Sequence, residues 1–506
     1  MVKLTFYSLS LAIGITTTFA QNDILAETFN NTLSNTELGL AAITTTNRTE
    51  FNACQTIQKI INNASSSFDV VFLPFTPNSH HYMTTSSQPS ACIYTPKTPQ
   101  DLATAMKILG QGRIRFAISC SGHASNQGFS STPGVHISLK NFQDVVVSPD
   151  NAYVDIGGGI SWADVYKKLD SSTVNVVGGR VPGPGIGGFI TGGGGFSWLT
   201  NQYGLTGDTL ISVDMVLPNG TLTRASEGVN EELFWAVKGG GNSFGVVYNF
   251  RLLAVPRPPK IYADTKFITH MSTAEFTAAI ANFSASNHDP KAQIIPTINS
   301  LLGGAIPTNI LLAYYDGIPS YDPFSMFNVG SLKEQSFNDF VQSLGVSNLQ
   351  ANQRGAFNTL SLQAFTPGVM DQIANQTKFW GGQSLLHSGT FISFDVEPFL
   401  AYSQFAKSAA WEHGDNALPL FLFFSWENVK EDEFWREAML ESCRVIAETA
   451  KGEGQDVDGL LLYPNYAMKM GNRVERLFGG NLGRIEEVRR RIDPDDVMLL
   501  TEYFRF

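Results

Sequence analysis

"GGRVPGPGIGGFITGGGG", residues 178–195, is the stretch that decides the fold. It lies in a segment of 48 residues, from 157 to 204, that holds 14 of the chain's 46 glycines. Glycine at this density costs conformational entropy, so a folded chain keeps it where the backbone needs positive φ or approaches something closely. A solvated linker fits poorly, because apolar residues are interleaved with the glycines: Ile186, Phe189, Ile190, Phe196, Trp198 and Leu199. The stretch therefore predicts a ligand-binding backbone.

Three of these glycines suggest a first kind of ligand. Gly183, Gly185 and Gly188 match the G-x-G-x-x-G dinucleotide fingerprint, so a nicotinamide-dependent dehydrogenase is one alternative. The match is weak, because the Rossmann turn needs a strand before the glycines and a helix at the last one, whereas Pro182 and Pro184 stand here. A P-loop is excluded, since no G-K-[ST] follows. We expect instead a large anionic ligand with a flat apolar ring, held by main-chain N–H groups from several loops.

Length and composition set the frame for this ligand site. The chain has 506 residues, more than one hydrophobic core usually supports, so we expect two domains or one large composite. A hydrophobic fraction of 43% with 36 Phe can fill such a core, and a net charge of -11 argues against nucleic acid or an anionic membrane as partner. None of the eight histidines forms an H-x-x-x-H pair, so we expect no protein-bound metal.

The N-terminus predicts export. Lys3 precedes the apolar run "LTFYSLSLAIGITTTF", and Thr18-Phe19-Ala20 forms a small-x-small cleavage site, so residues 1–20 are interpreted as a signal peptide rather than a transmembrane anchor. Glycosylation sequons fit the same interpretation. They stand at Asn30, Asn47, Asn63, Asn219, Asn282 and Asn375. We therefore expect a protein that is secreted or resides in the lumen of the secretory pathway.

Four cysteines are too few for a disulfide scaffold. Cys54 and Cys92 flank a loop-rich segment and could be bridged. Cys443 lies in "DEFWREAMLESCRVIAETAKG", whose apolar spacing is helical, so a buried free thiol is expected there. Cys120 is interpreted as structural.

The chain between about 91 and 255 alternates short apolar strands, brief helices and glycine turns. Thr98-Pro99-Gln100-Asp101 predicts a helix start, and Ser161 to Leu169 predicts a second short amphipathic helix. Later strands such as "NILLAYYDGI", "GTFISFDV" and "ALPLFLFFSWENV" alternate with longer helices. "LLLYPNYAMKM" is interpreted as a polar-aromatic strand, followed by a helix that Pro494 ends. The pattern is α+β.

At this point the motifs carry a family resemblance. "SGHASNQG" (121–128), "GPGIGGFITGGGG" (183–195) and "EELFWAVKGGGNSFGVV" (231–247) resemble, in order, three conserved elements of the berberine-bridge-enzyme-like oxidases. These oxidases carry an FAD-binding domain of the vanillyl-alcohol-oxidase (PCMH) type. "YPNYA" (463–467) and "IDPDDV" (492–497) match the family's C-terminal motifs, so the likeness covers about the whole mature chain.

The resemblance implies a domain order. Residues 21–87 would form an N-terminal segment packed on the FAD domain, which would span 88–258 as two α/β subdomains. Residues 259–458 would form a substrate domain with an antiparallel sheet covered by helices. The C-terminal segment 459–506 would return to the FAD domain.

The resemblance also implies the cofactor and its ligands. His123 corresponds to the histidine that the family bonds to the flavin 8α-methyl group, an anchor that fixes the cofactor and raises its potential. Val181 stands where some members have a second, cysteine tether, so a single bond is expected. Carried over by position, the FAD-binding residues are Ser119, Ser121, Gly122, His123, Ala124, Gln127, Gly128, Gly185, Ile186, Gly188, Gly192, Gly193, Gly194, Tyr203, Gly204, Asp208, Val246, Asn465 and Tyr466.

Substrate oxidation needs a base that takes a proton while hydride moves to the flavin. In alcohol-oxidising relatives a tyrosine of the Y-x-N-Y motif acts as base and a second tyrosine helps it, which matches Tyr463 and Tyr203. Asp395 and Glu427, on strand-like segments, are alternative bases. Pro184 stands where relatives often have Val, Ile or Leu near the flavin edge that oxygen reaches, which leaves the rate of reoxidation open.

The leading hypothesis is a secreted FAD-linked oxidoreductase that oxidises a small secondary-metabolite alcohol or amine, or drives an oxidative cyclisation, with O2 as the expected electron acceptor. An extracellular carbohydrate oxidase is an alternative. A non-catalytic flavin-binding glycoprotein is an alternative of another class. No nucleic acid and, after signal cleavage, no membrane is expected as a partner.

Overall fold

The computed structural model describes residues 48–60, 67–69, 81–301, 306–345, 351–471 and 474–506. The predicted signal peptide (1–20) and the sequons at Asn30, Asn47 and Asn63 lie outside the described residues. The chain divides into two compact units, Met1–Asn52 and Ala53–Phe506. Across the described ranges, no helix has both the length and the apolar character that crossing a bilayer requires.

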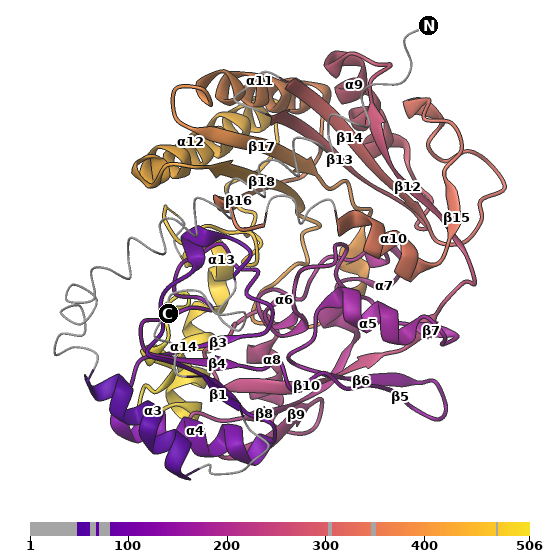
Figure 1. The fold of residues 1–506 in the computed structure, drawn as a ribbon. Coiled ribbons are helices and arrows are strands. Elements are labelled where there is room, and N and C mark those ends of the chain that lie inside the picture. Colours follow the sequence, from indigo (N-terminus) through magenta and orange to yellow (C-terminus); the bar gives the residue numbers. More distant parts are fainter. Residues whose placement is uncertain (1–47, 61–66, 70–80, 302–305, 346–350, 472–473) are drawn as a thin grey trace, which may run out of the picture. The chain divides into compact units, whose positions relative to one another are not determined.

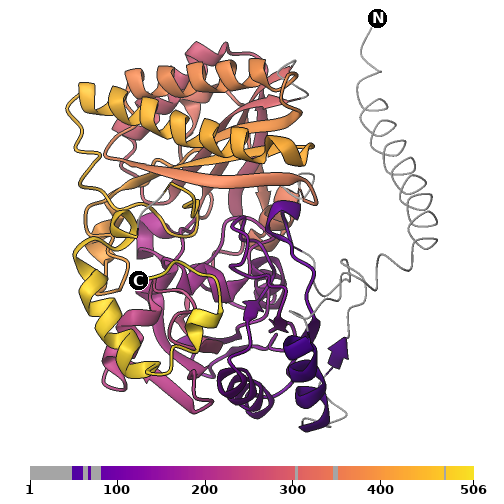
Figure 2. The same cartoon turned by 90° about the vertical axis from the view of Figure 1, so that its left-hand side faces the viewer.

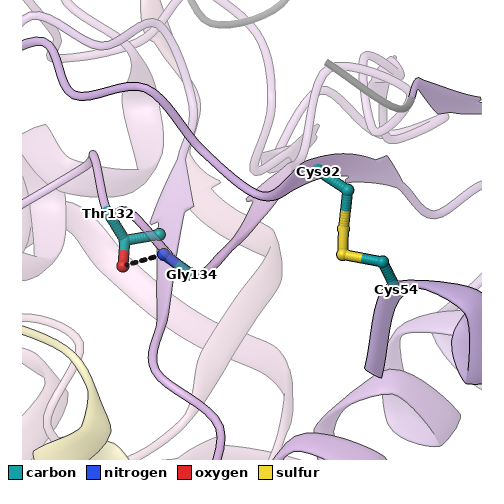
Figure 3. The surroundings of a disulfide bond; sticks show 4 residues. All are labelled: Cys54, Cys92, Thr132 and Gly134. Carbon is teal, nitrogen blue, oxygen red and sulfur yellow. Dashed lines mark hydrogen bonds between the residues drawn. A yellow bond between two sulfur atoms is a disulfide. The ribbon is translucent and has the colours of Figure 1, made fainter. Parts of the chain in front are cut away.

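A four-stranded sheet precedes the glycine-rich segment, in the order β1 (Ser67–Asp69), β2 (Cys92–Thr95), β4 (Val135–Ser138), β3 (Phe116–Ser119). β1 pairs antiparallel with β2, whereas β2, β4 and β3 are parallel. Helix α4 (Pro99–Gly112) crosses between β2 and β3, and the Asp101 N–H donates to Thr98 Oγ1 (3.1 Å) as the predicted cap. Figure 3 shows the disulfide that joins Cys54, in α3 (Arg48–Ile60), to Cys92 in β2.

A second, five-stranded sheet is antiparallel throughout. Its order is β5 (Val145–Val147), β6 (Tyr153–Gly157), β10 (Val246–Leu253), β8 (Leu210–Val216), β9 (Leu222–Ser226). The helix predicted from Ser161 is α5 (Trp162–Leu169), and Ser161 Oγ accepts from the Asp164 N–H. Its buried face, with Trp162 and Tyr166, belongs to the main hydrophobic core of the unit.

The third sheet has seven antiparallel strands and comes from the later part of the chain (Figure 1). Its order is β15 (Lys333–Gln335), β12 (Ile261–Ile268), β14 (Ile306–Tyr315), β13 (Ala292–Leu301), β17 (Gly389–Val396), β18 (Leu418–Trp426), β16 (Arg354–Leu362). Helices α9 (Thr273–Ser286), α11 (Pro367–Gln383) and α12 (Asp432–Gly452) cover one face (Figures 1 and 2). The other face is directed toward the glycine-rich segment, and the α+β class is confirmed.

Shorter elements connect the three sheets. They are η1 (Thr84–Ser86), β7 (Val174–Asn175), α6 (Ile186–Thr191), α7 (Thr200–Tyr203), η2 (Thr206–Thr209), α8 (Glu231–Val237), β11 (Val255–Pro256), η3 (Ser325–Phe327), α10 (Phe337–Ser343), η5 (Tyr402–Phe405), η6 (Val429–Glu431), α13 (Glu475–Phe478), η7 (Gly479–Asn481), α14 (Leu482–Ile492) and η8 (Met498–Leu500). The helix predicted to end before Pro494 is α14. Its Arg484 donates to Glu232 of α8 at 2.7 and 3.0 Å, so the C-terminal segment contacts the 231–247 block.

One predicted element is wrong. "LLLYPNYAMKM" is not a strand but a turn, in which the Tyr466 and Ala467 N–H groups both donate to the Tyr463 carbonyl at 3.1 and 3.0 Å. Pro464 has no N–H for a strand ladder, which favours the turn. The turn directs Tyr463, Asn465 and Tyr466 against the glycine-rich segment instead of spacing them along a sheet.

Candidate active site

The loop that follows β3 places His123 against two aromatic rings, which are also neighbours of each other. Gly122 (φ 68°) and Gly128 (φ 87°) give the loop its left-handed turns, and the Tyr82 N–H donates to the Gly122 carbonyl at 2.9 Å. The imidazole stacks on Tyr82 at 4.2 Å between centroids and on Phe357 at 6.0 Å. Burial lowers the pKa of His123 to about 4. The ring is therefore neutral at physiological pH, which is the nucleophilic form.

The residue that opens this loop is fixed by a second histidine. Ser119 Oγ lies 2.6 Å from Nε2 of the buried His136. Burial, with a smaller contribution from His81, lowers the pKa of His136 to about 3, so this hydrogen bond is formed by a neutral ring. Cys120, the next residue, is a free thiol whose Sγ donates to the Ile160 carbonyl at 3.4 Å. Burial raises its pKa to about 11, which fits the structural role predicted for it.

The glycine-rich segment forms α6 and the turn after it. Gly193, Gly194 and Gly195 have positive φ (138°, 82° and 93°), and a Cβ at Gly192 would lie 2.1 Å from Asn465 Oδ1. Most of the predicted glycines are thus required by close approach of other parts of the protein. Gly188 differs, because a Cβ there would meet nothing within 4 Å. The backbone at Gly188 therefore faces open space, as a ligand-facing glycine would.

The third motif, at 239–245, packs against the same helix. The Gly241 N–H donates to the Thr191 carbonyl at 2.8 Å, and a Cβ at Gly241 (φ 64°) would enter the ring of Tyr503. Several buried polar atoms around these loops have no hydrogen-bond partner among the described residues; they include Ser130 Oγ, Asn242 Oδ1 and Tyr503 Oη. Buried polar groups are normally hydrogen-bonded, so these atoms indicate a polar ligand.

The remaining predicted FAD ligands lie along the same elements. Ile186 and Val246 are buried, whereas Gln127 is exposed. Ser121 and Ala124 are half-buried in the His123 loop, and Gly204 closes α7 with φ 81°.

Asp208 has other partners than a cofactor. His413 Nε2 lies 2.9 and 3.0 Å from its two carboxylate oxygens, and the Leu205 and Lys407 N–H groups donate to it at 2.8 and 2.9 Å. Asp208 and His413 are both buried. These four contacts use the carboxylate fully and favour a structural role for the residue that the sequence predicted as an FAD ligand.

The two tyrosines of the C-terminal turn have different surroundings. Tyr463 is only 2% exposed and is enclosed by Phe196 and Trp411, and its hydroxyl accepts from Asn465 Nδ2 at 2.9 Å. Tyr466 is half-buried and packs on Phe421 at 4.3 Å. Burial is the main cause that raises both phenol pKa values above the usual range. Tyr466 therefore keeps surface on which a substrate can bind.

A buried ion pair contacts Tyr466 directly. Arg180 Nη2 donates to Glu397 Oε1 at 2.7 Å and to the Tyr466 hydroxyl at 2.6 Å, and that hydroxyl donates to Glu397 Oε1 at 3.0 Å. Asp395, two residues before Glu397, accepts from Ser393 Oγ, and burial raises its pKa to about 7. Proton-binding groups therefore gather on the side of the seven-stranded sheet that faces the glycine-rich segment.

Two other predicted catalytic residues lie elsewhere. Tyr203, at the end of α7, is half-buried, and its pKa is raised by burial and by Asp316 rather than by the Arg180 cluster. Glu427 is exposed just beyond β18, where its N–H donates to the Ser388 carbonyl. The contacts do not bring either residue to Tyr463.

Beside His123, the sheet presents an aromatic wall, which we define as Tyr82, Phe357, Phe391, Phe421 and Phe423. Phe357 lies 5.1 Å from both Phe421 and Phe423, and Phe391 lies 5.3 Å from Phe423. The wall ends at Tyr466, through Phe421. Its rings come from β16, β17, β18 and the segment before η1.

Sequence reasoning missed Tyr82, Arg180 and Glu397. Arg180 carried a usable signal, because it is the only charged residue within the quoted stretch 178–195. Glu397 follows Asp395 by two residues, and in an extended chain side chains two residues apart point to the same face. The position of Glu397 was therefore a signal that it lies near Asp395. Tyr82 carried no local signal, since its role depends on Phe357 and His123.

The residues fit FAD. A neutral imidazole, left-handed glycine turns, the open side of Gly188 and the unsatisfied polar atoms together provide a cradle for an anion beside an apolar ring system. His123, Gly188, Asn242 and Tyr503 are the residues of this cradle that would contact the cofactor.

Comparisons with known proteins agree. A family model described as an FAD binding domain matches residues 90–226. The FAD-dependent monooxygenase drtC of Aspergillus calidoustus is 29% identical over 82% of this chain and 82% of its own length.

Solved structures share the fold. A glucooligosaccharide oxidase of Acremonium strictum matches with a TM-score of 0.72 and 19% identity, over 88% of this chain and 96% of the other. A berberine bridge enzyme variant in complex with (S)-reticuline matches with a TM-score of 0.70 and 17% identity, over 88% and 97%. The family resemblance seen in the motifs is confirmed: the chain is an FAD-linked oxidoreductase with the fold of the berberine-bridge-enzyme-like oxidases.

Proposed function

We propose that the protein is secreted and oxidises a small secondary-metabolite alcohol or amine with an aromatic ring, or drives its oxidative cyclisation, by hydride transfer to FAD bonded to His123. The observation that carries the substrate class is the aromatic wall. Five rings from four segments lie within about stacking distance of their neighbours beside His123 and Tyr466. Tyr82, Phe357 and Phe423 are buried, whereas Phe391 and Phe421 are partly exposed, so the last two rings offer the surface on which a flat apolar ligand can bind.

A carbohydrate oxidase is the second candidate, because the glucooligosaccharide oxidase shares the fold. A sugar needs many hydrogen-bonding side chains, since its hydroxyls lose water on binding. The polar side chains on the same face of the sheet already have partners within the protein: Asn299 bonds to Thr297, Ser393 to Asp395, and Thr359 and Ser361 to backbone carbonyls. The wall therefore favours the aromatic substrate.

The covalent bond to the flavin is supported by the state of His123. Its neutral ring has a free electron pair for bond formation, and stacking against Tyr82 and Phe357 limits its rotation. Because Val181 stands at the position of the second tether in some relatives, the proposal has one covalent bond.

We assign proton abstraction to Tyr466, with the sequence-based candidate Tyr463 as the alternative. Tyr466 is half-buried and its hydroxyl contacts both an anion and a cation, whereas Tyr463 is buried and enclosed by other rings. Bound FAD supplies the acceptor for two electrons and one hydrogen. The wall orients the substrate ring and excludes water, and Tyr466 takes the proton from the substrate hydroxyl as the adjacent carbon is oxidised.

Anaerobic stopped-flow measurement tests this function. We expect benzylic alcohols and polyketide-like phenols to bleach the flavin absorbance of purified protein, and mono- and oligosaccharides to leave it unchanged. If only sugars bleach the flavin, the proposed aromatic substrate is wrong and the protein is a carbohydrate oxidase. A yellow protein that no substrate reduces would support the non-catalytic flavin-binding glycoprotein, and NAD(P)H binding lost on Gly183→Ala would support the nicotinamide-dependent alternative. Reoxidation on mixing with air measures how well O2 serves as acceptor with Pro184 in place.

Export can be tested separately. Asn219, Asn282 and Asn375 are exposed, so the folded surface presents these three sequons. We expect secreted protein to begin after Ala20 and to lose mass on treatment with an endoglycosidase. Retention of residues 1–20 in the mature protein would contradict the proposed export.

A further inference from the structure

Arg180, Glu397 and Tyr466 form a closed triangle of polar contacts with sides of 2.7, 2.6 and 3.0 Å. The three residues come from the glycine-rich segment, from the residues after β17 and from the C-terminal turn. Arg180 is 6% exposed and Glu397 is 2% exposed. We call this set the relay triangle.

Both the backbone and the side chain of Arg180 are held in place. The Trp198 indole N–H donates to the Arg180 backbone carbonyl at 3.0 Å. The guanidinium carbon of Arg180 lies 5.3 Å from the centre of the Phe399 ring and 5.9 Å from that of Phe196. Cation–π contacts of this kind are strongest where water is excluded. Arg180 is therefore a fixed positive charge beside the phenol.

One donor nitrogen and one acceptor oxygen of the relay triangle are not used in hydrogen bonds. Arg180 Nη1 and Glu397 Oε2 are buried, and neither has a hydrogen-bond partner in the ranges that the structure describes. A buried ion pair is expensive to desolvate and is weak evidence for stability by itself. An ion pair that in addition leaves two polar atoms unsatisfied is better explained by a role in the reaction.

The charges of the three residues before and after a proton transfer indicate what Arg180 does in the reaction. At rest the triangle holds one cation, one anion and a neutral phenol, with a net charge of zero. When the Tyr466 proton moves to Glu397 and the phenol receives the substrate's proton, the triangle becomes a cation with two neutral groups. Without Arg180 the same site would hold a single buried anion at rest, and a buried unpaired carboxylate takes up a proton instead. Glu397 could then accept nothing.

We propose that Arg180 is a positioning residue that keeps Glu397 ionised and holds Tyr466 against it, so that Glu397 receives the substrate's proton through Tyr466. The proposal rests on the function proposed above. In the balanced step, the substrate O–H proton bonds to the Tyr466 oxygen and the Tyr466 proton bonds to Glu397 Oε1. The carbon-bound hydrogen leaves with its electron pair to FAD, and the substrate becomes a carbonyl compound.

Other charged or titratable groups around the triangle act on it more weakly. They are Asp395 on β17, Tyr463 in the C-terminal turn and Tyr402 in η5. Burial raises the pKa of Glu397, and the Arg180 cation is the main influence that opposes this rise. Glu397 adds to the rise in the pKa of Asp395, and Arg180 opposes the rise at both carboxyl groups, so Arg180 is the group that can hold Glu397 ionised.

Infrared spectroscopy of the flavin-loaded enzyme tests the proposal without turnover. We expect Arg180→Met to show a protonated carboxyl band at about pH 8 that the wild type lacks, and the band to vanish in the Arg180→Met, Glu397→Gln double variant. Arg180→Lys, which keeps the charge, should show a smaller band. Arg251→Met is the control, because Arg251 likewise forms an ion pair with a carboxylate, Asp155 at 2.8 Å, but on the five-stranded sheet and without a contact to the relay triangle.

Flavin reduction gives the kinetic counterpart. We expect the pH at which reduction reaches half its maximum to rise by more than about one unit in Arg180→Met, and by less in Arg180→Lys. Arg251→Met should keep the wild-type profile.

The outcomes separate this proposal from the proposed function. If Glu397 is ionised in Arg180→Met as in wild type, the assignment of Arg180 is overturned, whether or not any substrate is found. If Arg180→Met does not fold, the neutral and polar Arg180→Gln takes its place, and an Arg180→Gln enzyme with the wild-type carboxyl spectrum and pH profile overturns it. If the new band appears but no substrate reduces the wild-type flavin, the proposed function fails while the electrostatic role of Arg180 is retained.

Discussion

Two buried carboxylates join the glycine-rich part of the chain to the segment after β17, and they are used differently. Asp208 bonds to His413 and to two backbone N–H groups, so each of its oxygens has a partner. Glu397 bonds to Arg180 and Tyr466 through one oxygen, and the other has no partner among the described residues. Both are buried, at 4% and 2% exposure.

The number of partners on each carboxylate separates a structural buried charge from one that can react. A carboxylate whose two oxygens both accept hydrogen bonds has a structural role, because protonating it would break several of these hydrogen bonds at once. A carboxylate with one free oxygen beside a phenol can accept a proton and keep its other bonds. The motif resemblance predicts Asp208 as a cofactor ligand, whereas our proposal gives the reactive role to Glu397.

Tyr466→Phe is expected to give the largest effect and sharpens the reactive side of the comparison. It removes the hydroxyl group but leaves the ring and the Arg180–Glu397 pair, so flavin reduction should slow by about 10²–10⁴-fold while stability falls by only about 1 kcal/mol. Stopped-flow reduction and thermal unfolding measure the two quantities. Tyr463→Phe is the control, and a larger loss there than at Tyr466 would return the base to Tyr463.

Asp208→Ala tests the structural side. Removing one partner of a buried pair leaves His413 and two N–H groups without an acceptor, so we expect a loss of about 3–5 kcal/mol in stability. The folded fraction should still reduce its flavin within about threefold of the wild-type rate, because Asp208 has no contact with the relay triangle. Thermal unfolding and single-turnover reduction decide this. Wild-type stability with lost flavin binding would support the original cofactor assignment.

The parts of the fold and of the site that the sequence could predict are those with a local signal. The glycine motifs, the His123 loop, the Thr98 and Ser161 helix starts and the Cys54–Cys92 pairing all depend on residues whose signal is local or matches a known motif. The relay triangle could not be predicted, because residues 180, 397 and 466 meet only through the tertiary fold. The stretch "LLLYPNYAMKM" forms a turn and not the predicted strand, because Pro464 favours a turn that the alternation of aromatic and polar residues does not reveal.

Asp395→Asn is expected to change the pH dependence of stability. The pKa of Asp395 in the folded protein is about 7, above its ordinary value of 3.8. The folded state therefore holds this proton more tightly than the unfolded state, and the carboxyl group favours folding at low pH and loses that contribution as pH rises toward 7. The stability of the variant relative to the wild type should therefore rise as pH increases from about 4 to 7, because only the wild type loses the contribution of this carboxyl, and the variant should unfold above the wild type at about pH 8.

Unfolding curves measured by the change in tryptophan fluorescence at several pH values provide the check. Asp432→Asn is a suitable control, because hydrogen bonds from Arg354 and Trp426 help to lower the pKa of that carboxyl and the opposite pH dependence is expected. Equal pH profiles for wild type and Asp395→Asn would mean that this carboxyl ionises normally.

Phe421→Leu gives the smallest effect and probes where the aromatic wall meets the relay triangle. Phe421 packs on Tyr466 at 4.3 Å and on Phe357 at 5.1 Å, so leucine keeps apolar contact but removes ring stacking. We expect aromatic substrates to bind about 0.5–1.5 kcal/mol more weakly, with an unchanged limiting rate of flavin reduction at saturating substrate. Phe379→Leu, at an exposed ring on α11, is the control. If the variant loses the same affinity for an aliphatic alcohol, Phe421 contributes only general apolar surface. The aromatic wall would then not select aromatic substrates over aliphatic ones.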